Sequence, residues 1–215
     1  LLEDTRLNDL ALSADAKWLL SAGPTLCLGL DPLDPGRANE KKGLLLWVEP
    51  EVETHIPGVR TPVVVALDAV GAIRAYGTAE GEVQFWQDGP QILMGWRGKA
   101  RVLDLEFDGA RRHLAILRED SLVVSKLGIP LHIGEARAKL LPVEDGALAF
   151  DPTGSLLAVA TNNGWQLRET RSLRVLASGE DSTTAAAFSS DGCLLAVGGE
   201  TGRVWVYACA GGQAK

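Results

Sequence analysis

The chain has 215 residues, of which 46% are hydrophobic and 23% are charged, and its formal net charge is −7. A chain of this length buries roughly 70% of its unfolded surface, so a core forms without disulfides or metals. The acidic balance, with no long run of Lys or Arg, argues against a nucleic-acid partner. The longest apolar runs, such as residues 44–48, are far shorter than the roughly 20 residues that cross a bilayer, so we expect no membrane partner.

The expected elements are short strands bounded by Gly, Asp, Asn and Pro, and no window favours a long helix. Residues 31–42, rich in Pro, Gly and charge, are a predicted loop insertion. In chain order the expected strands cover residues 10–12, 18–22, 43–48, 63–67, 73–77, 81–86, 91–94, 103–107, 114–117, 120–126, 147–150, 156–160, 164–169, 173–177, 185–188, 194–198 and 202–207.

The chain repeats itself. ALAFDPTGSLLAVATNNG, which begins at Ala147, aligns without a gap to AAAFSSDGCLLAVGGETG, at an offset of 38 residues. Weaker copies precede it, and each copy has a strand, a turn with Asp or Gly, a second strand, another turn and a third strand. A repeat of this kind buries its apolar faces by stacking on its neighbours. The repeat units are 8–56, 62–95, 101–133, 146–177 and 184–208.

The period near 40, the Asp-Gly turn and the aromatic end of the third strand resemble the WD40 β-propeller family. The most specific stretch is FSSDGCLLAVGGETGRVWVY, which ends at Tyr207. The resemblance implies an all-β fold in which residues 1–215 form one β-propeller domain of four-stranded antiparallel blades. About five repeats are visible, which fits either a five-bladed ring or part of a larger propeller.

The repeats also depart from the family pattern. The family pairs a Gly-His dipeptide with an Asp and a terminal Trp-Asp, but His55, His113 and His132 do not follow glycines. Trp86 holds the Trp position in the second unit, whereas Tyr207 holds it in the fifth. We therefore expect most of the buried His and Asp network of the family to be missing.

Motifs for catalysis and cofactors are absent from the sequence: it has no Walker A loop, nucleophile elbow, zinc-protease motif or dinucleotide fingerprint. Asp31 and Asp34 do not have the spacing of a calcium loop. The recurring Asp108, Asp151 and Asp191 are interpreted as turn residues that bond their own backbone. We interpret the histidines, including His113, as structural, and we expect no catalytic, cofactor-binding or metal-binding residue and no cofactor.

Cys27, Cys193 and Cys209 are odd in number and form no C-x-x-C pair, so they predict neither a disulfide framework nor a zinc site. We interpret them as packing residues in a reducing compartment. No secretory signal pattern is visible at the N-terminus, and the first residue is Leu1. These features favour an intracellular, cytoplasmic location and one domain of a larger protein.

The candidate partner-binding residues are Trp96, Arg97, Lys99 and Arg101, in a connection between two expected strands. Arg60 lies in the preceding equivalent connection and could join them. Trp and Arg are enriched at interface hot spots, and clustered cations on an acidic chain favour an acidic protein or peptide. The alternative is a Trp that covers the edge of a blade beside solvated cations.

The sequence favours a non-catalytic protein-interaction scaffold that presents loops to a protein or peptide partner. One alternative is a lactonase-like propeller hydrolase with a site in its central channel. The other is a structural domain that restrains a neighbouring effector domain.

Overall fold

The computed structural model describes residues 8–12, 14, 18–23, 43–48, 52–56, 62–69, 72–87, 94–110, 112–128, 132–210 and 213–214. The chain divides into two compact units, Leu1–Val102 and Leu103–Lys215, and each is described by itself. The described residues form strands and turns, and no helix among them is long and apolar enough to cross a membrane.

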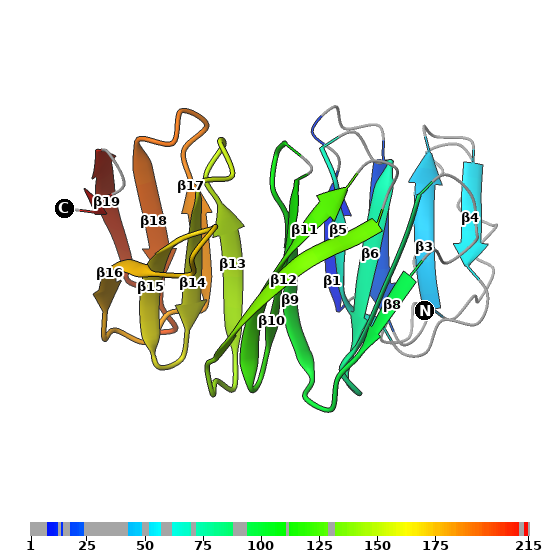
Figure 1. The fold of residues 1–215 in the computed structure, drawn as a ribbon, viewed down its shortest axis with the longest axis horizontal. Coiled ribbons are helices and arrows are strands. Elements are labelled where there is room, and N and C mark those ends of the chain that lie inside the picture. The colour runs from blue at the N-terminus through cyan, green and yellow to red at the C-terminus, as the bar shows by residue number, and fades with distance from the viewer. Residues whose placement is uncertain are drawn as a thin grey trace, which may run out of the picture. The chain divides into compact units, whose positions relative to one another are not determined.

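The first unit contains two four-stranded sheets, in the orders β1-β2-β3-β4 and β5-β6-β7-β8 (Figure 1). Each strand pairs antiparallel with the next strand in the chain. The strands are β1 Asp9–Leu12, β2 Trp18–Gly23, β3 Gly43–Val48, β4 Val52–Ile56, β5 Pro62–Leu67, β6 Ile73–Thr78, β7 Glu82–Gln87 and β8 Met94–Arg97.

Three further four-stranded sheets follow, and their strands are again antiparallel in chain order (Figure 1). The first of these strands begins with Val102, and all later residues belong to the second unit. The strands are β9 Val102–Phe107, β10 His113–Arg118, β11 Ser121–Gly128, β12 His132–Leu140, β13 Gly146–Phe150, β14 Leu156–Thr161, β15 Gly164–Glu169, β16 Val175–Gly179, β17 Ala185–Phe188, β18 Leu194–Gly198, β19 Val204–Ala210 and β20 Gln213–Ala214.

The same hairpin joins the first two strands of four sheets. A side-chain oxygen just after the first strand accepts a hydrogen bond from the backbone N–H that opens the second strand, five residues on. This bond closes the turn locally, as Asp and Ser side chains do in turns. The acceptor and donor residues are Asp68 and Ile73, Asp108 and His113, Asp151 and Leu156, and Ser189 and Leu194.

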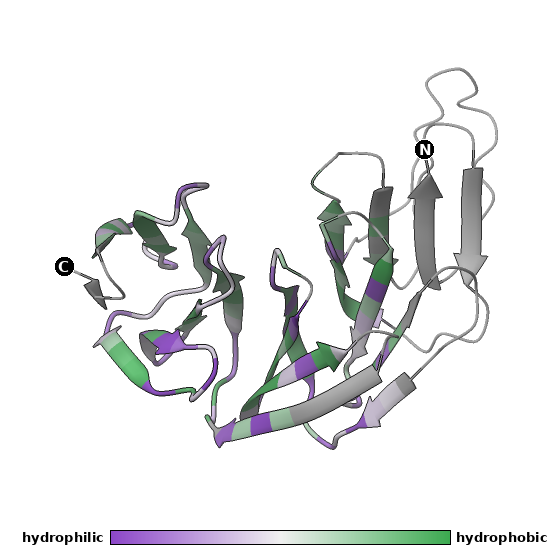
Figure 2. Ribbon diagram, turned by 45° about the horizontal axis from the view of Figure 1, so that its top comes forward, coloured by the Kyte–Doolittle hydropathy of each residue, from purple (hydrophilic) through white to green (hydrophobic). Residues whose placement is uncertain are grey.

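In the sheet β13–β16, the strands β13, β14 and β15 are largely buried on both faces. Successive residues of a strand point to opposite faces of the sheet. Leu157 and Val159 join an apolar cluster with side chains of β10 and β11, such as Ala115. Ala158 and Leu167 join another cluster with side chains of β18. Figure 2 accordingly shows green strands in this part of the chain and purple in many of the joining turns.

Two carboxylates tie neighbouring sheets together within the units. Asp9 on β1 accepts a hydrogen bond from the N–H of Val65 on β5 at 2.8 Å. Asp104 on β9 accepts one from the N–H of Leu148 on β13 at 2.6 Å. In both cases the other carboxylate oxygen accepts the N–H of the following residue on its own strand. Burial raises the pKa of Asp9, although these two N–H donors oppose the rise.

The all-β prediction and the four-stranded units are confirmed. Four sheets extend beyond the predicted units, and two of them do so by only two residues, at β8 and β16. β12 continues to Leu140, past residue 133, because β11 pairs with it as far as Ser121. In the last sheet the short strand β20 supplies a fourth strand beyond residue 208. The predicted loop insertion at residues 31–42 lies outside the described residues.

Candidate functional site

The predicted partner-binding residues of the first unit lie together at the end of the sheet β5–β8. Trp96 pairs with Val83 across β7 and β8. Its ring meets that of Phe85 edge to face, with 6.4 Å between the ring centroids. Phe85 is fully buried, so it holds one side of the Trp96 ring in place.

The turn that follows β8 is hydrogen-bonded to the turn between β6 and β7. The N–H of Gly98 donates to the carbonyl oxygen of Gly81 at 2.9 Å. Gly81 has a φ of +84°, and a Cβ there would lie 2.4 Å from the carbonyl oxygen of Ala100. Only glycine fits that approach. These backbone contacts, at Gly98 and at Ala100, hold residues 96–101 in place. We refer to these residues as the 96–101 segment.

The cations of the 96–101 segment face outward. The Arg97 side chain is 90% exposed, and its Nε lies 3.5 Å from Oε1 of Glu82, the residue opposite it on β7. Lys99 and Arg101 are also exposed, and Trp96 is half-buried. The structure therefore brings four of the five predicted residues together. The charge of one of them, Arg97, is partly neutralised by Glu82. Arg60 lies outside the described residues.

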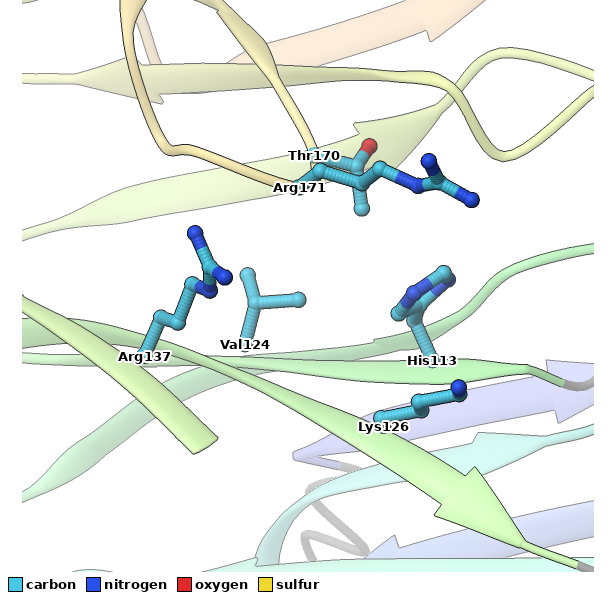
Figure 3. Close-up of a pocket in the computed structure, with 6 residues that line it drawn as sticks. All are labelled: His113, Val124, Lys126, Arg137, Thr170 and Arg171. Atoms are coloured by element: carbon cyan, nitrogen blue, oxygen red, sulfur yellow. The ribbon is translucent and has the colours of Figure 1, made fainter. Parts of the chain in front are cut away.

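The second unit has a pocket of about 300 Å³ on the sheet β9–β12, facing the turn that joins β15 to β16 (Figure 3). His113 pairs with Lys126, and Val124 pairs with Arg137, so these side chains share one face of the sheet. This basic pocket is lined by His113, Val124, Lys126, Arg137, Thr170 and Arg171.

His113 at the basic pocket is oriented by a buried carboxylate. Its Nδ1 lies 2.9 Å from Oδ2 of Asp108, and Asp108 is fully buried. The other oxygen of Asp108 accepts the backbone N–H of His113. The interpretation of Asp108 as a turn residue agrees with these bonds. Sequence reasoning missed the pocket, because its basic residues come from three strands and a distant turn, and no local motif reveals how these segments are aligned.

A second pocket, of about 560 Å³, contains the turn carboxylates Asp151 and Asp191. Asp151 accepts hydrogen bonds from the N–H of Leu156 and from the hydroxyl of Thr153. Asp191 accepts from the hydroxyl of Ser189. These bonds indicate that each carboxylate stabilises its own turn. No group of three or more His, Cys, Asp or Glu that could hold a metal ion occurs among the described residues.

Cys193 and Cys209 are free thiols, the first exposed and the second buried. The N–H of Cys209 donates to the carbonyl oxygen of Cys193 at 2.7 Å, so the two residues lie side by side where β18 and β19 pair. Burial raises the pKa of Cys209, and the Asp191 carboxylate raises that of Cys193. Raised pKa values favour the protonated thiol, which is the less reactive form.

The fold is similar to that of a solved protein. The chain is similar to the β-propeller domain of Cps50 (Swd1) from Myceliophteria thermophila, with a TM-score of 0.69 and 12% identity over 96% of this chain and 67% of that one. The fold is therefore that of a β-propeller, and its four-stranded sheets are blades.

Residues 170–207 match the family described as WD domain, G-beta repeat (WD40). The match covers β16, β17, β18 and the first part of β19. This stretch of the β-propeller therefore resembles a WD40 repeat. No curated protein matches the sequence.

Proposed function

We propose that this chain is a non-catalytic protein-interaction scaffold that presents the 96–101 segment to an acidic protein or peptide partner. WD40 propellers commonly serve as protein-interaction scaffolds, and this common role supports the assignment of the chain as a scaffold. The observation that supports the surface is the outward display of Arg97, Lys99 and Arg101 beside an anchored Trp96. A rigid aromatic ring next to exposed cations is a common composition of an interface hot spot.

The anchoring contacts favour binding without rearrangement. The edge-to-face contact with Phe85 and the hydrogen bond from Gly98 to Gly81 hold the segment before any partner arrives. A surface that is already ordered loses little conformational entropy on binding. The exposed cations would accelerate encounter with an acidic partner and favour it over a basic one.

We further propose that the interaction takes place in the cytoplasm, where free thiols such as Cys193 and Cys209 stay reduced. No specific observation among the described residues favours the hydrolase or the restraining-domain alternative.

The test is an affinity capture from native lysate with the full-length protein and two variants. Lys99→Glu with Arg101→Glu reverses two exposed charges, and Trp96→Ala removes the ring. Arg203→Glu, at an exposed arginine of the β18–β19 turn, is the control for a charge reversal elsewhere. All variants must keep the thermal melt of the wild type.

We expect a partner that is captured by the wild type and by Arg203→Glu and is lost with Lys99→Glu and Arg101→Glu. Its measured affinity should fall as salt is raised, because exposed charges are screened. A partner retained by every variant would place the binding surface elsewhere. If no specific partner is captured at all, the scaffold assignment itself is wrong.

A further inference from the structure

The basic pocket of the second unit concentrates positive charge on an acidic chain. Lys126, Arg137 and Arg171 are exposed cations, and His113 adds an imidazole. None of the described residues that line the pocket is acidic. The chain as a whole has a formal net charge of −7, so this local excess of cations is opposite to the overall balance. Such a concave cluster attracts anions.

The basic side chains reach the pocket from two sides. Arg137 and His113 rise from the sheet, while Arg171 lies across from them in the turn between β15 and β16 (Figure 3). Thr170, beside Arg171, is buried, and its hydroxyl has no hydrogen-bond partner among the described residues. A ligand between the sheet and this turn would meet Arg137 on one side and Arg171 on the other (Figure 3).

The carboxylate that contacts His113 is bonded to other groups as well. Asp108 contacts His113 from behind, and its oxygens accept the backbone N–H groups of Arg112 and His113. The Nε of Arg112 also lies 3.7 Å from Oδ2 of Asp108. Asp108 is fully buried. It therefore orients the His113 ring, and the exposed cations of the pocket keep their charge for a ligand.

This set of groups matches a phosphate better than a carboxylate. A guanidinium donates two parallel N–H bonds to a phosphate, and a phosphate monoester has a charge near −2 at neutral pH. Two arginines and a lysine can together donate to three phosphate oxygens, whereas one carboxylate leaves donors and charge uncompensated.

We propose that the basic pocket binds a phosphate monoester on a phosphorylated side chain of a peptide. The volume of about 300 Å³ is roughly ten times the share of one water molecule in the liquid. The pocket therefore has room for atoms beyond a single phosphate, such as the side chain and backbone that present it. The proposal depends on this pocket alone and not on the 96–101 segment.

Fluorescence polarisation with a labelled peptide tests the proposal on the full chain. The probe contains one phosphoserine flanked by Gly and Ala, and the same peptide with Ser or with Glu serves for comparison. We expect binding of the phosphoserine peptide only, weakened by rising salt. Arg137→Gln and Arg171→Gln should each weaken it about tenfold or more, since each removes charged hydrogen-bond donors. Arg203→Gln, at an exposed arginine outside the pocket, should leave it unchanged.

Inorganic phosphate is the second arm, as a competitor and as a ligand by itself. Displacement of the phosphopeptide by millimolar phosphate supports the shared site. Binding of phosphate alone, lost in Arg171→Gln, supports the phosphate site with a small molecule as its source. The proposal is overturned if neither probe binds, if the Glu peptide binds as well as the phosphoserine peptide, or if Arg203→Gln weakens binding as much as Arg171→Gln. A loss of binding to the 96–101 segment in the capture experiment leaves these results unaffected, so the two proposals fail separately.

Discussion

The blades β13–β16 and β17–β20 have closely similar sequences, yet corresponding side chains on one face differ sharply in exposure. Trp165 and Leu167 are 3% and 0% exposed. Their counterparts by strand register, Val204 and Val206, are 66% and 60% exposed. The opposite faces do not differ in this way, because Leu157 and Leu195 are both fully buried.

The difference comes from the neighbours and not from the strands themselves. The blade β13–β16 packs against β9–β12 on one face and against β17–β20 on the other. Among the described residues, the blade β17–β20 packs on one face only. The comparison teaches that an apolar pattern in a repeat specifies a face that can be buried, while the adjoining blade determines whether it is buried.

In both blades the turn after the first strand pairs a carboxylate with a hydroxyl, but the two groups come in opposite order along the chain. In β13–β16 the carboxylate of Asp151 comes first and accepts the hydroxyl of Thr153 two residues later. In β17–β20 the hydroxyl of Ser189 comes first and donates to the carboxylate of Asp191 two residues later. Asp151 is buried and Asp191 is exposed, so the same pairing encloses a charge in one blade and displays it in the other.

The largest expected contrast is between Leu167→Ala and Val206→Ala. Removing a fully buried leucine should cost about 2–5 kcal/mol of unfolding free energy, because it leaves a cavity. Val206→Ala should change it by less than about 0.5 kcal/mol, as expected for a surface site. Urea denaturation of the full chain measures both. Leu195→Ala, on the buried face of the last blade, should cost as much as Leu167→Ala. Equal costs for Leu167→Ala and Val206→Ala would contradict the comparison.

A second contrast concerns the glycines in the turns that lead into the third strands. Gly164 has a φ of +117°, and a Cβ there would lie 2.3 Å from the carbonyl oxygen of Gly179. Gly202 has a φ of +74°, and a Cβ there would have no atom within 4 Å. Gly164→Ala should therefore cost about 2–4 kcal/mol, from strain and collision together. Gly202→Ala should cost about 1 kcal/mol, from strain alone. Thermal melts compare the pair, and a larger loss for Gly202→Ala would argue against the collision.

A third contrast concerns the turn acceptors Asp151 and Ser189. Asp151→Ala leaves the partly buried N–H of Leu156 and the Thr153 groups without their acceptor, which should cost about 1–3 kcal/mol. Ser189→Ala breaks a more exposed bond to the N–H of Leu194 and should cost about 0.5 kcal/mol. Chemical denaturation at neutral pH is the measurement. Asp151→Asn, which keeps one acceptor oxygen, should recover part of the loss; no recovery would mean that the bonds are not the cause.

The smallest expected effect is on the pH dependence of stability. The hydroxyl of Ser189, and then the N–H of Cys193, hold the pKa of Asp191 below its ordinary value. A carboxylate with a lowered folded pKa stabilises the protein above the ordinary Asp pKa of about 3.9, and this contribution is lost as the pH falls through the folded value.

The melting temperature of Asp191→Asn should therefore lie slightly below that of the wild type at neutral pH, and the gap should close below about pH 4. Glu200→Gln, which removes one exposed negative charge from the turn between β18 and β19, is the control. A gap of constant size down to low pH would contradict the assignment.

Much of the fold could be predicted from the sequence because the information is local. The alternation of the strands and the Asp-containing turns repeat with a period near 40, and both act between residues that are close in the chain. The role of Asp108 and Asp151 as turn residues followed from the same local chemistry. The corresponding acceptor in the last blade is Ser189 and not Asp191, a shift that the turn sequence alone did not reveal.

The two candidate sites also differ in whether their residues are close together in the sequence. Trp96, Arg97, Lys99 and Arg101 lie close together in one connection of the chain, so their proximity could be predicted. The basic pocket could not be, since His113, Arg137 and Arg171 meet only through strand register and the packing of neighbouring blades. The short strand β20 was missed for a related reason: two residues have no periodicity to detect.

The carboxylates that tie neighbouring blades have a consequence for the order in which the second unit opens. Asp104 links β9 to the N–H of Leu148 on β13. The position equivalent to Asp104 on β13 is Ala147, whose methyl group accepts no hydrogen bond. The last blade is thus held to its neighbour by side-chain packing without this link. Local opening events begin where the fewest interactions must break. We expect the amides of β17 and β18 to exchange with deuterium before those of β13 and β14, so that the chain loosens from its last blade inward.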